Sequence, residues 1–404
     1  MSSNKTDMNR YPIILLLLLL IAGCQVDKAK EKAIIAAMDS PAKTDSGEPH
    51  LFTDAKGTVY LSWLENSEDN NEFKFSILND GKWSEPILID SGQNWFVNWA
   101  DYPMLATNGN EFVAHYLEKS GDDTFAYDVK LTSSVDQGKT WKAASTLHDE
   151  GKEAEHGFVS MLPYKENFFI SWLDGRNTVM EGMEHHEGHH GQMTLRAAIV
   201  DKEGKKLNEW ELDNRTCDCC QTSAAITERG PVVVYRDRSE DEIRDMSIVR
   251  LVNNEWTKPV SIYADSWKIV GCPVNGPRVV ADGNFLAIVW YTMPGEKSKV
   301  NVIFSKDGGE SFGAPVQIDE GNAIGRVDLV MLENETVMAS WMEGTTIKAI
   351  KVHADGTKEL PIIIATSSES RSSGFPQMTK YNDQVLFAWT DAKEKIVKVA
   401  SVTL

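Results

Sequence analysis

Seven segments of the sequence share one pattern, in which a run of β-branched and apolar residues leads to an aromatic residue and then to a polar turn. Examples are TVYLSWLE, NFFISWLD and TVMASWME. Successive aromatic residues lie 53, 56, 63, 55, 51 and 48 residues apart. A period of about fifty residues built from short strands is typical of a β-propeller, because a single blade cannot bury its faces without neighbours. The aligned aromatic residues, which we expect to pack between blades, are Trp63, Tyr116, Trp172, Tyr235, Trp290, Trp341 and Trp389.

The last repeat contains only three apolar runs, up to KVASVTL, whereas the others contain four. The segment KAIIAAMDS, residues 32–40, matches the fourth strands of other repeats, such as EPILIDSG and LPIIIATS. We therefore predict that it pairs with the last blade and closes the ring, which removes free sheet edges. The predicted fold is an all-β, seven-bladed β-propeller, formed as a single domain by residues 32–404.

The N-terminal segment has the pattern of a secretory signal. Lys5 and Arg10 precede the apolar run IILLLLLLIAGC, which is too short to cross a bilayer, and a polar segment follows it. The residues IAGC resemble the bacterial lipobox, and this resemblance implies cleavage before Cys24 and lipid attachment to its thiol. We predict a lipoprotein signal peptide at residues 1–23 and a short linker at 24–31; a plain signal peptide cleaved elsewhere is the alternative.

The predicted leader also bears on localisation and partners. Gln25 resembles the sorting residue of outer-membrane lipoproteins, which implies the cell envelope, with the membrane as a partner and the domain facing the periplasm or the exterior. Without residues 1–23 the formal net charge changes from −19 to −20, because the leader carries two basic residues and one acidic residue. A surface this acidic repels nucleic acid, so we expect no nucleic-acid partner.

Four cysteines besides the anchor occur in two connections between repeats, TCDCCQT and GCPVNGP. The longest repeat contains an insertion, MEGMEHHEGHHGQM, with four histidines. In a propeller these connections lie on one face of the ring. Thiolates favour Cu(I), and imidazoles suit copper or zinc, so we predict a copper-type transition-metal site on this face. Its candidate ligands are Cys217, Cys219, Cys220, Cys272, His185, His186, His189 and His190.

Three other interpretations of these residues stay open. Cysteines of envelope proteins are commonly oxidised, and a disulfide between Cys272 and one of the clustered cysteines would staple two loops. A redox-active dithiol within the cluster is the second interpretation. In the third, the histidine insertion is a solvated loop that collects metal only incidentally.

Two turns of the sequence carry the same motif. SSVDQGKTW and SKDGGESF share the order S-x-D-x-G-x-S/T followed by an aromatic residue, in which Asp and Gly serve a tight hairpin. The chain therefore resembles the sialidase-like propellers with Asp-box, or BNR, repeats, and a six-bladed sialidase-type propeller is the alternative fold. The motif residues, structural in role, are Ser134, Asp136, Gly138, Thr140 and Trp141, and Ser305, Asp307 and Gly309.

This resemblance implies an activity that can be compared with the residues. Sialidases hold the substrate carboxylate with three arginines and use a Tyr/Glu nucleophile pair with an Asp acid. After the leader, no arginine occurs before Arg176, so the first two repeats lack the expected arginine. For an exo-sialidase-like glycoside hydrolase, or a lyase, acting on an acidic carbohydrate, the candidates are Arg278 and Arg326 as clamp and Asp101 and Asp237 as acid and base.

We therefore favour a lipid-anchored binding module with a metal site over an enzyme. A scaffold for another envelope protein is a third class, with the aromatic stretch NWFVNWADY as its candidate contact. Acidic residues also stand two positions after six of the seven aligned aromatic residues. These carboxylates either accept hydrogen bonds at strand ends or form a negative funnel that concentrates cations.

Overall fold

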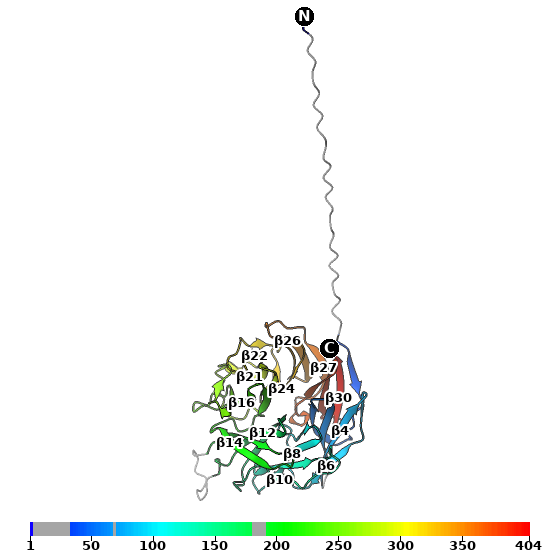
Figure 1. The fold of residues 1–404 in the computed structure, drawn as a ribbon, viewed down its shortest axis with the longest axis vertical. Helices are drawn as coiled ribbons and strands as arrows, with labels where there is room; N and C mark the ends of the chain where they lie inside the picture. The colour runs from blue at the N-terminus through cyan, green and yellow to red at the C-terminus, as the bar shows by residue number, and fades with distance from the viewer. Residues whose placement is uncertain (3–32, 68–69, 180–190) are drawn as a thin grey trace. The chain divides into compact units, whose positions relative to one another are not determined.

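Seven antiparallel sheets form a ring in the computed structural model, which describes residues 1–2, 33–67, 70–179 and 191–404 (Figure 1). The chain divides into two compact units, Met1–Lys32 and Ala33–Leu404, and the sheets belong to the second. Within the described residues the helical turns are η1 (Pro294–Glu296) and η2 (Arg371–Ser373), and no helix there is long and apolar enough to span a membrane. The predicted seven-bladed β-propeller is confirmed, and the six-bladed alternative is wrong.

Each blade begins with a strand at the axis of the ring, where these strands contact one another from blade to blade. The first strands are β2 (Ser46–Thr53), β7 (Met104–Asn108), β11 (His156–Tyr164), β15 (Ser223–Thr227), β20 (Arg278–Asp282), β24 (Ala323–Met331) and β28 (Gln377–Tyr381). The second strands are β3 (Val59–Asn66), β8 (Glu111–Lys119), β12 (Asn167–Asp174), β16 (Gly230–Arg236), β21 (Phe285–Thr292), β25 (Thr336–Glu343) and β29 (Gln384–Asp391).

The third strand of each blade is largely buried, whereas the outermost strands are more exposed. The third strands are β4 (Asn71–Asn79), β9 (Tyr127–Ser134), β13 (Thr194–Val200), β17 (Met246–Val252), β22 (Lys299–Ser305), β26 (Thr346–His353) and β30 (Ile396–Thr403). The outermost are β5 (Lys82–Trp83) with β6 (Ile87–Gly92), β10 (Ser145–Thr146), β14 (Lys206–Asp213), β18 (Glu255–Trp256) with β19 (Val260–Ser261), β23 (Val316–Gln317), β27 (Ile362–Thr366) and β1 (Ile35–Met38).

The ring closes through the N-terminal strand. β1 pairs antiparallel with β30, in a register that places Ile35 opposite Val402 and Met38 opposite Val399. The last blade therefore contains three C-terminal strands and one N-terminal strand, as the sequence pattern predicts. With β1 the last blade has four strands, as do four of the other blades, and its third strand β30 is paired on both sides.

The repeated aromatic residues are buried in the second strands. Trp63, Trp172 and Trp341 are fully buried between blades. Their indole N–H groups donate to the carboxylates two positions later: to Glu65 at 3.0 Å, to Asp174 at 2.8 Å and to Glu343 at 2.9 Å. A buried indole N–H needs an acceptor, so in these blades the acidic residue after the aromatic residue has a structural role.

The two Asp-box turns have matching hydrogen bonds. In the second blade Ser134 Oγ donates to Asp136 at 2.7 Å and accepts the N–H of Gly138 at 2.9 Å. In the fifth blade Ser305 Oγ donates to Asp307 at 2.8 Å and accepts the N–H of Gly309 at 2.9 Å. Each aspartate also accepts the N–H and the hydroxyl group of the Thr140 or Ser311 that follows. The motif therefore specifies one local hairpin geometry in both blades.

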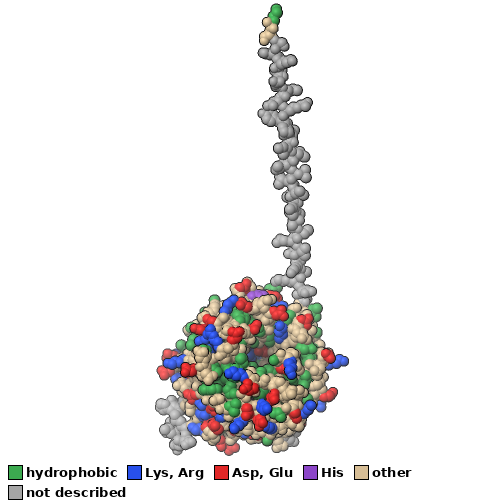
Figure 2. Space-filling model, viewed as in Figure 1, with side chains coloured by type: hydrophobic (Ala, Val, Ile, Leu, Met, Phe, Trp, Pro, Cys, Tyr) green, Lys and Arg blue, Asp and Glu red, His purple; other side chains and the backbone are tan. Residues whose placement is uncertain are grey.

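A central cavity of about 650 Å³ lies between the first strands. The molecule is hollowed at its centre when viewed along the axis of the ring (Figure 2). The lining is mainly apolar, with methionines from several blades, and includes Arg278 and Tyr102. At one end, the ring of Phe375 stacks on that of Trp99 with centroids 5.6 Å apart and lies 6.4 Å from that of Tyr102, so aromatic side chains pack over that end of the channel.

Candidate functional site

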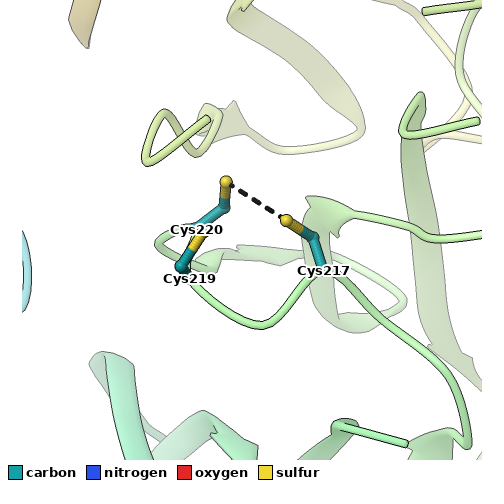
Figure 3. A group of neighbouring side chains, drawn as sticks. All are labelled: Cys217, Cys219 and Cys220. Atoms are coloured by element: carbon teal, nitrogen blue, oxygen red, sulfur yellow. Dashed lines mark hydrogen bonds between the residues drawn. The ribbon is translucent and has the colours of Figure 1, made fainter. Parts of the chain in front are cut away.

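Three cysteine sulfurs gather in the connection between β14 and β15. Cys217, Cys219 and Cys220, which we call the cysteine site, are all buried, and their Sγ atoms lie within 4.8 Å of one another (Figure 3). The Sγ atoms of Cys217 and Cys220 are 3.6 Å apart. Tetrahedral metal–sulfur bonds of about 2.3 Å place sulfurs about 3.8 Å apart, so the spacing suits three ligands of one metal ion.

Backbone contacts from two further connections orient these thiols. Arg236, fully buried at the end of β16, accepts the N–H of Cys217 with its carbonyl oxygen at 3.1 Å. Its guanidinium donates to the carbonyl groups of Asn275 and Arg244, at 2.8 and 2.7 Å. The N–H of Asn275 in turn donates to the Sγ of Cys220 at 3.4 Å. The site is therefore built by the ring, because its supports come from the fourth blade and from the start of the fifth.

A ladder of charged side chains forms one wall of the site. Arg244 donates from Nη1 to the Sγ of Cys217 at 3.0 Å. Glu242 pairs with Arg244 at 2.9 Å and with Arg238 at 2.8 Å, and Arg238 reaches Asp218 at 3.2 Å. We call Arg244, Glu242, Arg238 and Asp218 the arginine ladder. It holds a guanidinium against the sulfur, and a positive charge there favours a thiolate over a thiol.

The three thiols have unequal affinities for protons. Hydrogen bonds from the thiols of Cys219 and Cys220, together with the charges of Arg244 and Arg236, hold the pKa of Cys217 well below its usual value. The hydrogen bond with Cys217 raises the pKa of Cys219, and burial raises the pKa of Cys220 to about 12. These shifts make Cys217 the most acidic of the three thiols, in keeping with its contact with Arg244.

The fourth cysteine lies beside the cysteine site, outside the group of sulfurs that lie within 4.8 Å of one another. Cys272 lies between β19 and β20, is exposed, and interacts with the thiol of Cys219, which lowers the pKa of Cys272. The sequence prediction that the two cysteine connections meet is consistent with this contact. All four of these cysteines are free thiols, so the alternative of a disulfide staple is not found among the described residues.

The predicted histidine ligands, His185, His186, His189 and His190, lie outside the described residues, as does the predicted lipid anchor Cys24. The described residue Met193 follows the histidine insertion. It is buried, packs in the same apolar cluster as the three cysteines, and accepts the N–H of Thr216 at 2.9 Å. One end of the connection that carries the insertion therefore lies beside the cysteine site.

A buried acidic cluster adjoins the site between the second and third blades. Tyr127 donates its hydroxyl to Glu155 at 3.0 Å and lies 3.5 Å from Asp101, which accepts the N–H of Phe158 at 2.7 Å. Burial raises the pKa of Asp101 to about 8. Burial, reinforced by the charges of Asp218 and Cys272, raises the pKa of Glu155 to about 7. Asp101 was predicted as an acid/base candidate, whereas the sequence analysis missed Tyr127 and Glu155.

The two candidate clamp arginines are both engaged by the protein. The guanidinium of Arg326 donates to Ser373 Oγ at 2.6 Å and to three backbone carbonyl groups of residues 369–374, and it lies over the ring of Trp99. Arg278 contacts the hydroxyl of Tyr102 and lies 3.5 Å from a carboxylate oxygen of Asp328. Arg278 lines the central cavity, but Arg326 serves as an anchor for a loop.

Asp237, the second acid/base candidate, lies at the end of β16. Its carboxylate accepts the N–H of Arg238 at 2.6 Å and the hydroxyl of Ser247 at 3.0 Å. Burial raises its pKa to about 6. Because both hydrogen bonds are made within the fourth blade, they give Asp237 a structural role. Its backbone pairs with that of Thr216, next to the cysteine site.

A cluster of two histidines and two carboxylates was also missed from the sequence. The rings of His148 and His156 stack with centroids 3.6 Å apart, and Glu150 lies 2.9 and 2.7 Å from them. The Nδ1 of His156 faces two backbone carbonyl groups and its Nε2 faces carboxylates. Although burial opposes it, the contact with Glu150 raises the pKa of His156. Because Arg176 already pairs with Asp174 at 2.7 Å, we interpret this cluster as an ion-pair network.

The described fold is similar to solved structures of enzymes that act on carbohydrates. Alignment with the polysaccharide lyase Uly1 gives a TM-score of 0.52 at 10% identity, over 88% of this chain and 89% of that one. The α-L-arabinofuranosidase Arb93A from Fusarium graminearum gives 0.49 at 14% identity over 92% and 97%, and the NanB sialidase from Streptococcus pneumoniae gives 0.44 at 12% over 91% and 70%. No family model and no curated protein matches the chain. These similarities show the fold alone.

Proposed function

We propose that this protein is a cell-envelope binding protein that holds one soft transition-metal ion, Cu(I) in preference to Zn(II), at the cysteine site. The observation that carries the proposal is the gathering of three buried sulfurs within 4.8 Å of one another. Thiolates are the ligands that select Cu(I) and zinc from other metals, whereas a single buried cysteine packs as a small apolar residue. The three cysteines also pack in an apolar cluster, but the closeness of their sulfurs to one another suits metal ligation.

The electrostatics around the cysteine site also support metal binding. A group of three thiolates with Cu(I) carries net negative charge, which is costly in a buried position unless positive charges lie nearby. Arg244 contacts the sulfur of Cys217, and the charge of Arg236, whose carbonyl accepts the Cys217 N–H, helps to lower the pKa of Cys217. The N–H of Asn275 adds a hydrogen bond to a second sulfur. Supports of this kind orient metal ligands and stabilise the charge of the bound cluster.

The envelope location remains part of the proposal and rests on the lipobox at Cys24. Free thiols in an oxidising compartment are readily oxidised, and a metal bound to them protects them. A lipid-anchored domain with a metal site suits storage, delivery or sensing of copper at a membrane surface. Copper and zinc are therefore the proposed cofactors or cargo, and the membrane is the proposed partner.

Metal analysis of the full chain tests this proposal. Protein purified reduced and without oxygen should bind one equivalent of Cu(I), measured by elemental analysis and by competition with a chromophoric Cu(I) chelator. Cys219→Ser should lose that equivalent, while Met246→Leu, a volume-conserving change in the core of the fourth blade, should keep it. No stoichiometric metal in the reduced wild type, or equal occupancy in Cys219→Ser, rejects the proposal.

A second set of variants addresses the predicted imidazole ligands. Replacing His185, His186, His189 and His190 by asparagine removes the imidazoles while leaving the cysteines in place. A loss of Cu(I) affinity supports the predicted mixed cysteine and histidine site. Unchanged affinity assigns the metal to the cysteines alone and makes the insertion an incidental metal collector.

A second candidate function is an enzyme acting on an acidic carbohydrate, as the sialidase-like resemblance implies. The observation that favours it is the buried cluster of Tyr127, Glu155 and Asp101, because two carboxyl groups with raised pKa values beside a tyrosine hydroxyl suit acid/base chemistry. Turnover of a fluorogenic sialoside, abolished by Glu155→Gln, would establish it. Thermal-shift measurements with sialic and uronic acids against Cu(I) compare the two functions directly.

A further inference from the structure

The four cysteines differ sharply in how they meet solvent. Cys217, Cys219 and Cys220 are buried, with Cys217 covered by the arginine ladder and Cys220 by the backbone of Asn275. Cys272 is exposed, and its neighbour Val270 is among the most exposed apolar residues of the described chain, at 85%. The cysteine site therefore meets solvent through the Cys272 side.

Cys272 lies in a short segment that is attached at both ends. Before it, the N–H of Ile269 donates to the carbonyl of Glu242 at 3.0 Å, at the base of the arginine ladder. After it, Asn275 is held by the guanidinium of Arg236 and donates to Cys220. Between these attachments the backbone passes through positive φ values at Gly271 and Val274. Cys272 therefore lies three residues from the attachment on either side.

We propose that Cys272 is the exchange ligand of the cysteine site: it completes the coordination of a metal held by the three buried thiolates, and it is the ligand that an incoming soft donor displaces. This inference rests on the proposed function and adds the route by which metal enters and leaves. Buried thiolates supply affinity, and one exposed thiolate gives access, because ligand substitution at a thiolate-bound metal needs an approach path for the new ligand.

The exchange step needs no oxidant or reductant. An incoming thiolate donates an electron pair to Cu(I), the bond between Cu(I) and the Sγ of Cys272 breaks, and the released thiolate takes a proton from water. The oxidation state of copper stays the same. The partner class is therefore a protein or small molecule that presents an accessible thiolate or thioether to the Cys272 side.

Transfer kinetics of the Cu(I)-loaded full chain test the inference. We compare wild type, Cys272→Ser and Cys219→Ser, each mixed with one equivalent of Cu(I) and then freed of unbound metal, with glutathione as the incoming thiolate and bathocuproine disulfonate as the coloured acceptor. Cys272→Ser should keep one equivalent of copper but release it about tenfold faster, since one coordination position is already vacant. Cys219→Ser should fail to hold the equivalent.

Alkylation of the reduced protein by iodoacetamide, mapped by peptide mass spectrometry, is the companion measurement. Cys272 should react first in metal-free protein and should be protected when Cu(I) is bound. Release from Cys272→Ser at the wild-type rate, or no protection of Cys272 by copper, overturns the inference. Complete loss of copper from Cys272→Ser also overturns it, because Cys272 would then be a principal ligand. Absence of copper from the wild type rejects the proposed function instead.

Discussion

The two faces of the ring are built in different ways. On the face of the Asp-box turns, the second and fifth blades repeat one set of hydrogen bonds: the serine hydroxyl accepts the glycine N–H at 2.9 Å in both. On the opposite face, the connections between blades do not repeat. There the cysteine site takes its residues from the third-to-fourth and fourth-to-fifth connections, and its supports from the fourth blade.

This difference teaches where specificity can arise in a repeat protein. A turn closed by hydrogen bonds within five residues needs only its own sequence, and so it can be copied from blade to blade. A site assembled from several connections needs the ring to bring them together, and its residues are free to differ. The following predictions test that contrast by altering each face in turn.

The largest effect is expected from Arg326 on the loop face. Arg326→Ala removes a buried guanidinium that binds Ser373 and the carbonyl groups of residues 369–374, and leaves those acceptors unpaired. We expect the free energy of unfolding to fall by about 3 kcal/mol or more, measured by urea denaturation. Arg371→Ala, which removes an exposed arginine over the same Trp99 ring, is the matched control and should change little. Equal effects of the two would contradict the anchoring role.

The second prediction concerns how stability depends on pH, through Asp101 on the loop face. Because the pKa of Asp101 is raised to about 8 in the folded protein, the folded state keeps a proton that the unfolded chain loses near pH 4. The unfolded state then binds fewer protons, so stability falls as pH rises from about 4 to about 8, by up to about 1.4 kcal/mol per pH unit for one group. Asp101→Asn should flatten this decline in urea denaturation midpoints measured across the range.

Glu155 and Glu48, whose pKa values burial raises to about 7, should leave a residual decline in the Asp101→Asn variant. An unchanged slope in Asp101→Asn would show that Asp101 is ionised in the folded protein. Comparing Asp101→Asn with Asp101→Ala separates two effects. Asparagine removes the titratable proton but keeps an acceptor for the Phe158 N–H, whereas alanine removes both.

The third prediction addresses the arginine ladder. Arg244→Gln removes the positive charge beside Cys217 but keeps a polar side chain that can donate hydrogen bonds. We expect Cu(I) affinity to fall about tenfold or more, as for other groups that support metal ligands, with one equivalent still bound at saturation. Arg244→Lys should recover part of the loss, because it restores the charge without the planar guanidinium. Unchanged Cu(I) affinity in both variants would show that the arginine ladder does not support metal binding.

The smallest effects should come from the turn face, and they should be equal. Gly138 and Gly309 adopt φ values of +78° and +84°, and an added Cβ would approach Phe75 and Ile248 at 2.6 and 2.8 Å. Each Gly→Ala variant should lose about 1–2 kcal/mol of stability and keep full copper occupancy. Thermal denaturation of both variants measures whether the two losses of stability are equal. A clear difference between the two would show that the turns depend on their blades.

Much of the architecture was predictable because it depends on local patterns. Alternating burial, the aromatic residue in each second strand and the Asp-box turns are all properties of short segments. The closing strand β1 was predictable because its apolar pattern matches other outer strands. The meeting of Cys272 with the cysteine connection followed from counting strands, since connections of the same kind lie on one face.

The partners within the site could not be predicted in the same way. Arg244 occupies a charged stretch, and nothing in that stretch separates it from Arg238 as the residue that reaches Cys217. Tyr127 and Glu155 come from different blades, and their contact depends on how far one blade is rotated against the next. The stacking of His148 and His156 depends likewise on the path of a connection.

By itself, the sequence determined a ring of seven blades, its closure and the turns, because hydrogen bonding and burial within each blade act over a few residues. Only the tertiary structure decided that one of three clustered thiols contacts a guanidinium while a fourth cysteine stays exposed, and that Arg326 anchors a loop. Those arrangements depend on the curvature of the closed ring and on side-chain directions across blades, and both are set by packing over the whole domain.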